Sequence, residues 1–291
     1  MESVYAWLAA LAKSAHLPQA FQYPFMLRGM IAGLIVAPLL GGMSHLVVAR
    51  RLAFFSTALG HAALTGVSLG LLLGEPISGP YAGIFGICLL SGLAMVYVKR
   101  RAALPPDTLI GVFLALTLGL GICLLVAVTK RFNIHQIEAV MFGSLLTVSD
   151  LDLALLLVGG AIVAVVLARP YNDLYQDSLS PNLAEARGID TMRTEYVFVL
   201  TLTLAIVLSL KIVGALLVEA LVVVPAAAAR NLARSTRSYI VWSVLIATVS
   251  AELGLFVSAR WRVPSGGAIV LVLSALFFVT LGLGRGLSRR D

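Results

Sequence analysis

Four ionisable residues lie inside long apolar stretches of the sequence: His45, His61, Glu219 and Glu252. A charge at the centre of a membrane helix costs roughly 2.5 to 3.5 kcal/mol, so each needs a partner, a watery cavity or a function. Imidazole is the commonest side-chain ligand of transition metals, and carboxylates bind the same ions. Their possible chemistry is therefore metal coordination, proton relay or pairing between helices.

His61 is surrounded by small residues, with Gly60 before it and Ala62, Ala63 and Gly66 after it. Small residues let a neighbouring helix or a substrate approach closely. From spacing alone, a histidine that is hydrogen-bonded between helices is favoured over a metal ligand.

The two carboxylates differ in their surroundings. Glu219 has apolar neighbours on both sides, and an uncompensated charge there would be too costly to keep. It therefore holds a proton, pairs with a base such as His61, or faces a water-filled path. Glu252 lies nearer the outer end of its stretch, which favours a carboxylate at the edge of a cavity. For His45, about a turn before Arg50, a hydrogen-bonding role is favoured over metal binding.

The composition requires lipid as the solvent. The chain has 291 residues, of which 60% are hydrophobic and 12% charged, and its mean hydropathy is +0.99; soluble domains carry roughly 25% charged residues. The apolar residues come in blocks of about 20, the length of a membrane helix. A net charge of +7 would suggest nucleic acid in a soluble protein, but the basic residues stand at block ends. An all-α polytopic membrane protein with no nucleic-acid partner follows.

Apolar blocks bounded by charge, Pro or Gly predict nine membrane helices. They cover residues 26–48, 53–73, 80–98, 109–129, 151–168, 195–210, 213–229, 239–258 and 267–284. The sixth and seventh are separated by so few residues that eight spans is an open alternative. Pro38 and Pro225, inside blocks, predict local breaks.

The basic residues predict that the N-terminus is outside and the C-terminus cytoplasmic. This orientation places 14 of the 21 Lys and Arg residues on the inner side, in agreement with the excess of positive residues in cytoplasmic loops of membrane proteins. They are Arg50, Arg51, Lys99, Arg100, Arg101, Arg169, Arg187, Arg193, Arg230, Arg234, Arg237, Arg285, Arg289 and Arg290.

Two segments outside the blocks are expected to fold locally. Residues 1 to 20 read as an amphipathic helix at the outer interface, and residues 21 to 291 as a single transmembrane domain. Within the inner loop 169–194, Ser180 and Pro181 predict the start of a short helix and Gly188 its end. The sequence contains no P-loop, so any ATPase must be a separate subunit.

Several stretches, taken together, resemble the permeases of zinc and manganese ABC importers over nearly the whole chain. In the family, the second span carries an aromatic residue, Gly, Asp, three further residues, then His and Ala; residues 51–70 with His61 are similar. Residues 107–111, 182–189, 213–228 and 264–266 resemble the start of the fourth span, the coupling helix, the seventh span and the start of the last.

The resemblance implies a homodimer in a bacterial inner membrane, with two ATPase subunits and a metal-specific solute-binding protein as partners. The metal is then a transported substrate, zinc in preference to manganese or iron, and no cofactor is bound permanently. The family's second-span histidine lies on the metal path, which favours His61 as a transient ligand. The implied ATPase contacts are Ser180, Pro181, Asn182, Ala184, Glu185, Ala186 and Gly188.

One departure from the family concerns charge. Relatives have a carboxylate one helical turn before the histidine, where this chain has Thr57. We hypothesise that Glu219 supplies the missing charge from the facing span, so that the metal path contains His61, Thr57, Glu219 and Glu252.

Other functions remain open from the residues alone. An importer of larger chelates is disfavoured because such permeases are usually longer. A proton-driven secondary transporter would use Glu219 and His61 as its relay. An intramembrane enzyme is disfavoured, since the HExxH motif is missing from the sequence.

Overall fold

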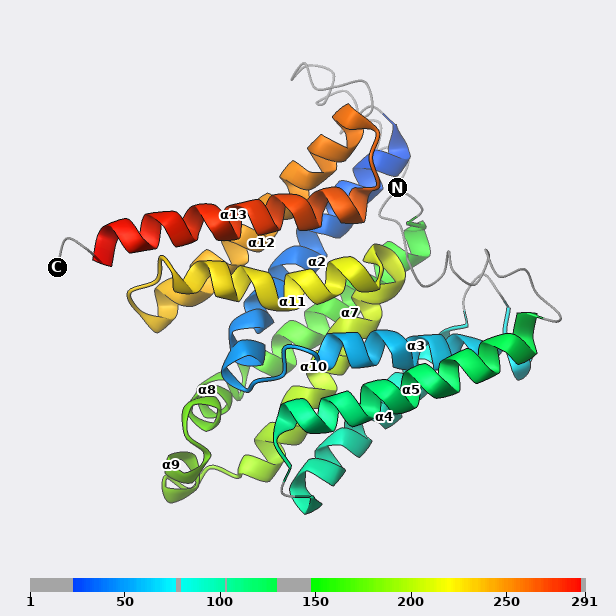
Figure 1. The fold of residues 1–291 in the computed structure, drawn as a ribbon, viewed down its shortest axis with the longest axis horizontal. Helices are drawn as coiled ribbons and strands as arrows, with labels where there is room; N and C mark the ends of the chain where they lie inside the picture. Colours follow the sequence, from blue (N-terminus) through cyan, green and yellow to red (C-terminus); the bar gives the residue numbers. More distant parts are fainter. Residues whose placement is uncertain (1–22, 77–79, 103, 130–147, 289–291) are drawn as a thin grey trace. The chain divides into compact units, whose positions relative to one another are not determined.

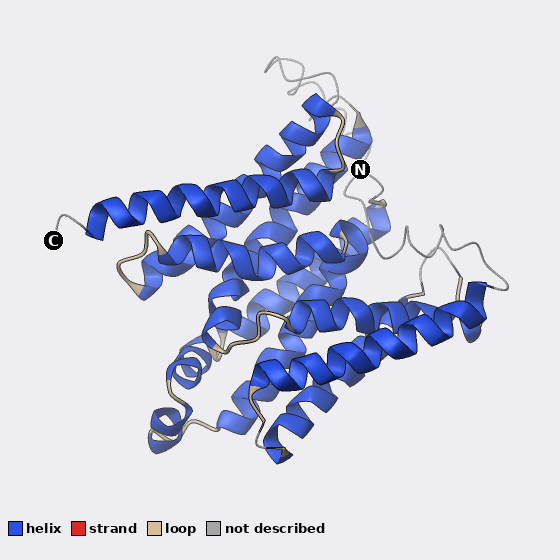
Figure 2. Cartoon of the chain, viewed as in Figure 1, coloured by secondary structure: helices blue, strands red, loops and turns tan. Residues whose placement is uncertain are grey.

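The computed structural model describes residues 23–76, 80–102, 104–129 and 148–288, and every regular element in these ranges is a helix (Figures 1 and 2). The helices are α2 (Pro24–Ala49), α3 (Phe55–Leu72), α4 (Tyr81–Arg101), α5 (Pro106–Thr129), α7 (Asp150–Ala168), α8 (Tyr171–Leu179), α9 (Pro181–Ala186), α10 (Thr191–Val213), α11 (Ala215–Arg230), α12 (Thr236–Trp261) and α13 (Ser265–Ser288). The expected all-α fold is confirmed. The predicted N-terminal interfacial helix, residues 1 to 20, lies outside the described residues.

All nine predicted apolar helices are present, and eight of those described are long and apolar enough to cross a membrane. The ninth is α11, which has 16 residues. Its separation from α10 is set by Gly214, whose φ of 85° and ψ of 159° define a backbone conformation that is essentially restricted to glycine. By length, α11 is therefore the short member of the pair that the sequence left open.

The breaks predicted at Pro38 and Pro225 are wrong. Both prolines lie inside helices that continue through them, α2 and α11. Proline removes one intrahelical hydrogen bond, but in a packed bundle the freed carbonyl can be satisfied locally and the helix continues. The prolines therefore did not locate the chain break, which lies instead at Gly214 between α10 and α11.

The helices differ in how much apolar surface they leave accessible. Most of α3 and α10 is buried, whereas at most 28% of the apolar stretch is buried in each of α4, α5, α7 and α13. Exposed large side chains include Leu90, Val126, Val158 and Leu271. So large an apolar surface is not left to water, so lipid or another protein chain must cover it.

The chain divides into two compact units. The first contains the described parts of residues 1–45, 143–158 and 212–291, and in it α11, α12 and α13 pack on one another. Glycines permit close approach here: a side chain at Gly41 would overlap Ala247 of α12, and one at Gly254 would overlap the backbone of Ile269 in α13. Small residues at such contacts are typical of membrane helices.

The second unit contains the described parts of residues 46–142 and 159–211, and α3 packs in it against both α4 and α5. A Cβ at Gly66 of α3 would lie 2.5 Å from the carbonyl oxygen of Gly83 in α4, so the two backbones touch. On the side of α5, the hydroxyl of Thr65 donates a hydrogen bond to the carbonyl of Thr117 at 2.8 Å. These contacts bury most of α3 and hold it in a fixed position.

Candidate functional site

Helix α3 has one accessible face, and that face carries the predicted metal-path residues. Its residues that are not buried are Thr57, His61, Leu69 and Leu72. Thr57 and His61 are four positions apart and therefore lie one above the other on the helix surface. The structure thus brings these two predicted residues together. A hydroxyl and an imidazole so arranged can contact an ion that moves along the face.

The two predicted carboxylates belong to the other unit. Glu219 is half-buried on α11 and Glu252 is half-buried on α12. Oxygen Oε1 of Glu252 is buried, has no hydrogen-bond partner among the described residues, and lies 3.3 Å from the position a Cβ would take at Gly33 of α2. The approach of Glu219 to His61 stays a prediction, because these residues belong to different units.

His45 is almost fully buried, and its ring packs edge-on against Tyr239 with the centroids 6.0 Å apart. This packing supports a structural role for His45. Among the described residues, no group of three or more His, Cys, Asp or Glu side chains is arranged to hold a metal ion. A transit site built from few ligands is compatible with that arrangement, since a transported ion must leave as readily as it enters.

The second predicted site is the docking segment, which we define as residues 180–190. Ser180 is extended, Pro181 opens α9, and Gly188 ends the turn with a φ of 80°. The predicted start and stop of this short helix are confirmed. Ala184 is its one buried residue, while Asn182, Glu185 and Ala186 of α9 and Gly188 beyond it are exposed. The helix therefore leaves most of its surface accessible.

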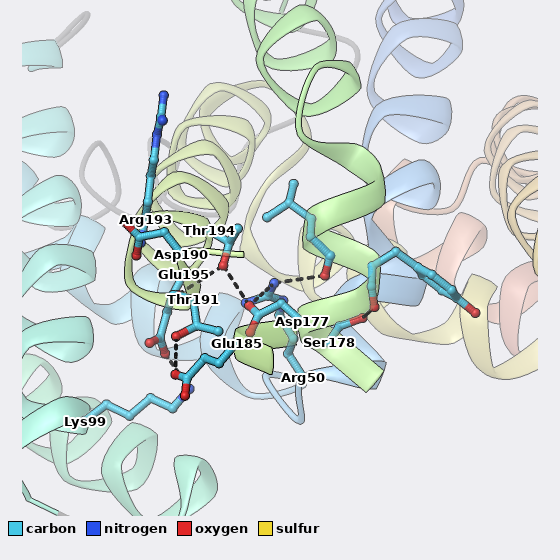
Figure 3. Close-up of polar contacts among 12 residues, drawn as sticks. Arg50, Lys99, Asp177, Ser178, Glu185, Asp190, Thr191, Arg193, Thr194 and Glu195 are labelled. Atoms are coloured by element: carbon cyan, nitrogen blue, oxygen red, sulfur yellow. Dashed lines mark hydrogen bonds and ion pairs between the residues drawn. The ribbon is translucent and has the colours of Figure 1, made fainter. Parts of the chain in front are cut away.

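The docking segment follows helix α8, which sequence reasoning missed, and α8 is fastened by a buried ion pair (Figure 3). Arg50, in the turn after α2, contacts Asp177 of α8 at 2.8 Å, and the two side chains are 9% and 6% exposed. Burial lowers the pKa of Arg50, and the neighbouring Asp177 opposes that shift. The carboxylate thus stabilises a guanidinium that burial alone would destabilise.

A second charged group joins α4 to α10. Glu195 contacts Lys99 at 2.5 Å and Arg100 at 3.0 Å. Beside it, the hydroxyl of Thr191 donates to Glu185 of the docking segment at 2.8 Å. Arg50, Lys99 and Glu195 line one small pocket together with apolar side chains.

The sequence contained a signal for these pairs that was not used. Arg50, Lys99 and Arg100 end apolar blocks, and Asp177 and Glu195 lie on segments that return to the same predicted side. Basic residues at span ends were interpreted as orientation signals. Opposite charges at the same depth also predict ion pairs between segments, and that inference would have found both groups.

The fold and these two sites define a polytopic membrane protein with a short, firmly attached helix outside its spans. A family model described as "ABC 3 transport family" matches residues 22–283. The chain belongs to this family and is the permease subunit of an ABC transporter, whose ATPase is a separate subunit. The proton-driven alternative is therefore wrong.

Individual relatives extend this result. The chain is 32% identical to the high-affinity zinc uptake system membrane protein ZnuB of Haemophilus influenzae, over 89% of this chain and 96% of that protein. It is 30% identical to the manganese transport system membrane protein MntC of Listeria monocytogenes, over 89% of this chain and 90% of that protein. The resemblance to zinc and manganese permeases is thereby confirmed.

A solved structure agrees with this fold. The complex of PsaBC from Streptococcus pneumoniae with Fab superposes with a TM-score of 0.78 at 26% sequence identity, and the match covers 93% of this chain and 96% of that one.

Proposed function

We propose that this permease carries a divalent metal ion, zinc in preference to manganese, past His61 and Thr57 on the accessible face of α3. The observation that carries the proposal is the pattern of burial on α3, in which packing covers every face except the one with these two residues. A membrane helix has little reason to keep an imidazole half-exposed in an apolar environment. A path for a metal ion supplies such a reason.

The assembly we propose has two copies of the chain around a central path and two ATPase subunits, each on one docking segment. A solute-binding protein delivers the metal on the outer side, with the N-terminus outside and the C-terminus cytoplasmic. The exposed docking segment and the family membership support this arrangement. In the proposed orientation Arg50, Lys99 and Arg100 are cytoplasmic, in agreement with the rule that Lys and Arg gather on the cytoplasmic side.

Zinc is supported by the similarity to ZnuB, and manganese is the second candidate because MntC matches over the same share of this chain. Imidazole and carboxylate serve both ions. The discriminating experiment is ATP-dependent uptake of each metal into vesicles that contain this chain, its ATPase and its binding protein. We expect zinc to be imported faster than manganese at equal concentration. If manganese is imported faster, manganese is the substrate.

Glu219 and Glu252 complete the proposed path, and Glu219 supplies the charge that relatives place at position 57. Two variants test this role together. We expect Glu219→Gln to lower zinc import, and Thr57→Asp to restore import in the Glu219→Gln background, because it puts a carboxylate one turn from His61. Normal import by Glu219→Gln, or no recovery in the double variant, would contradict the role.

A further inference from the structure

The docking segment makes exposed side-chain hydrogen bonds to its neighbours, among them the bond from Thr191 to Glu185 and the bond from Arg187 to Gln176. Bonds in contact with water contribute little rigidity, because water competes for both partners. Helix α8, directly before the docking segment, is held by the ion pair of Arg50 and Asp177, which is buried on both sides. This pair is therefore the better shielded connection.

This pair joins three segments at one carboxylate oxygen. Oδ2 of Asp177 accepts from Arg50 at 2.8 Å and from the hydroxyl of Thr194, in the first turn of α10, at 2.9 Å. Arg50 also donates to the carbonyl of Leu174 in α8 at 3.0 Å, and its guanidinium lies 4.7 Å from the centre of the Phe198 ring of α10. Helix α8, helix α10 and the turn before α3 therefore meet at this node (Figure 3).

The turn that carries Arg50 is itself constrained. The next residue, Arg51, has a φ of 57°, a left-handed conformation that residues other than glycine rarely adopt. Such a conformation persists only where the surroundings fix it. Backbone hydrogen bonds provide this fixation: the N–H of Arg51 donates to the carbonyl of Val48 at 3.2 Å, and the N–H of Leu52 donates to that of Val47 at 2.9 Å, as at many helix ends. Helix α3 begins a few residues later at Phe55.

Stability alone does not explain the pair. Replacing a buried ion pair by apolar residues of similar volume is often neutral or stabilising, whereas removing one partner is strongly destabilising. Charge-assisted hydrogen bonds also fix the direction and distance between the groups they join. Two segments joined in this way move together, so the pair can transmit movement from one to the other.

We propose that Arg50 and Asp177 are positioning residues that carry the movement of the docking segment to the base of α3, the helix that bears His61. This inference rests on the proposed function, in which the ATPase binds residues 180–190. When the ATPase moves the docking segment, α8 moves with it, and the bonds of Asp177 displace the turn at Arg50. The path runs through groups in contact, a chain of the kind that can carry coupling between sites.

The test is the amount of zinc imported per ATP hydrolysed by the assembled transporter. The variant Arg50→Met with Asp177→Leu replaces the pair by apolar side chains, so we expect it to fold, retain its ATPase and hydrolyse ATP. Import per ATP should fall roughly tenfold, within the range typical of coupling between sites. Asp177→Asn, which keeps the shape but loses the charge, should show a smaller fall and serves as a second variant.

The control replaces an ion pair outside this node: Arg28→Met with Asp150→Leu, whose native side chains lie 2.9 Å apart in the first unit. We expect native import per ATP from the control. If the double variant Arg50→Met with Asp177→Leu and the single variant Asp177→Asn both import the native amount of zinc per ATP, the inference is overturned and the proposed function stays intact. If the native complex imports neither metal, or does not retain an ATPase, the proposed function fails and this inference fails with it.

Discussion

The close contact of α3 with α4 gives a quantitative prediction for Gly66→Ala. The added methyl group would lie 2.5 Å from the Gly83 carbonyl oxygen and 2.8 Å from the Ile84 Cα. These distances are about 0.9 Å and about 0.6 Å short of the 3.4 Å at which ordinary contact begins. Both obstacles are backbone atoms, so no side chain can rotate away. The helices must separate, and overpacking of this kind costs about 1–3 kcal/mol.

Helix propensity opposes this cost. Alanine is favoured over glycine in a helix by about 1 kcal/mol, which leaves a net destabilisation of about 1–2 kcal/mol when the backbone clash takes the upper half of its range. The matched control is Gly86→Ala in α4, where an added Cβ meets nothing within 4 Å. The control gains the propensity without a clash, so it should be as stable as the native protein or more stable.

Thermal unfolding of the purified permease in one detergent measures the difference. We expect Gly66→Ala to unfold several degrees below the native protein, since about 1 kcal/mol shifts Tm by roughly 2–4 °C in a large domain. Gly86→Ala should unfold at or above the native temperature. If Gly66→Ala is as stable as Gly86→Ala, the backbones of α3 and α4 do not touch and the described burial of α3 is wrong.

Two further substitutions test other parts of the structure by thermal unfolding. Asp177→Ala should lower the free energy of unfolding by about 3–5 kcal/mol, because it leaves Arg50 buried without its partner. Asp150→Ala should lower it by at most about 1 kcal/mol, because the Asp150 side chain is 43% exposed and that of its partner Arg28 is 30% exposed. Equal losses in the two variants would show that burial is not the cause. Gly214→Ala should lower the free energy of unfolding by about 1–3 kcal/mol, because an alanine is strained at these backbone angles. The control Gly267→Ala, whose added Cβ meets nothing within 4 Å, should leave the stability unchanged. Matching Tm values for the two variants would argue against the described break between α10 and α11.

The sequence predicted the helices well because membrane spans have a strong local signal. Each apolar block had to form a helix to satisfy its backbone in lipid, and the start and stop at Pro181 and Gly188 used rules for helix ends. Helix α8 was missed because a short polar helix has no such requirement. Its position depends on Asp177 meeting Arg50, a long-range contact.

The candidate sites divide in the same way. The face shared by Thr57 and His61 could be predicted from their spacing, since helix geometry alone places them together. Which face of α3 stays accessible could not, because it depends on where the glycines of α4 and α5 meet the helix. The role of Glu219 depends on the approach of another helix and stays a prediction for the same reason.

The central claim is that a divalent metal ion passes His61 on the accessible face of α3. Its most direct test is ATP-dependent zinc uptake by vesicles that contain the full transporter, comparing the native chain with His61→Ala and with Leu90→Ala, an exposed position on α4. The account predicts that His61→Ala retains its ATPase but loses zinc uptake, while Leu90→Ala imports normally. Zinc uptake at the native rate by His61→Ala would contradict it.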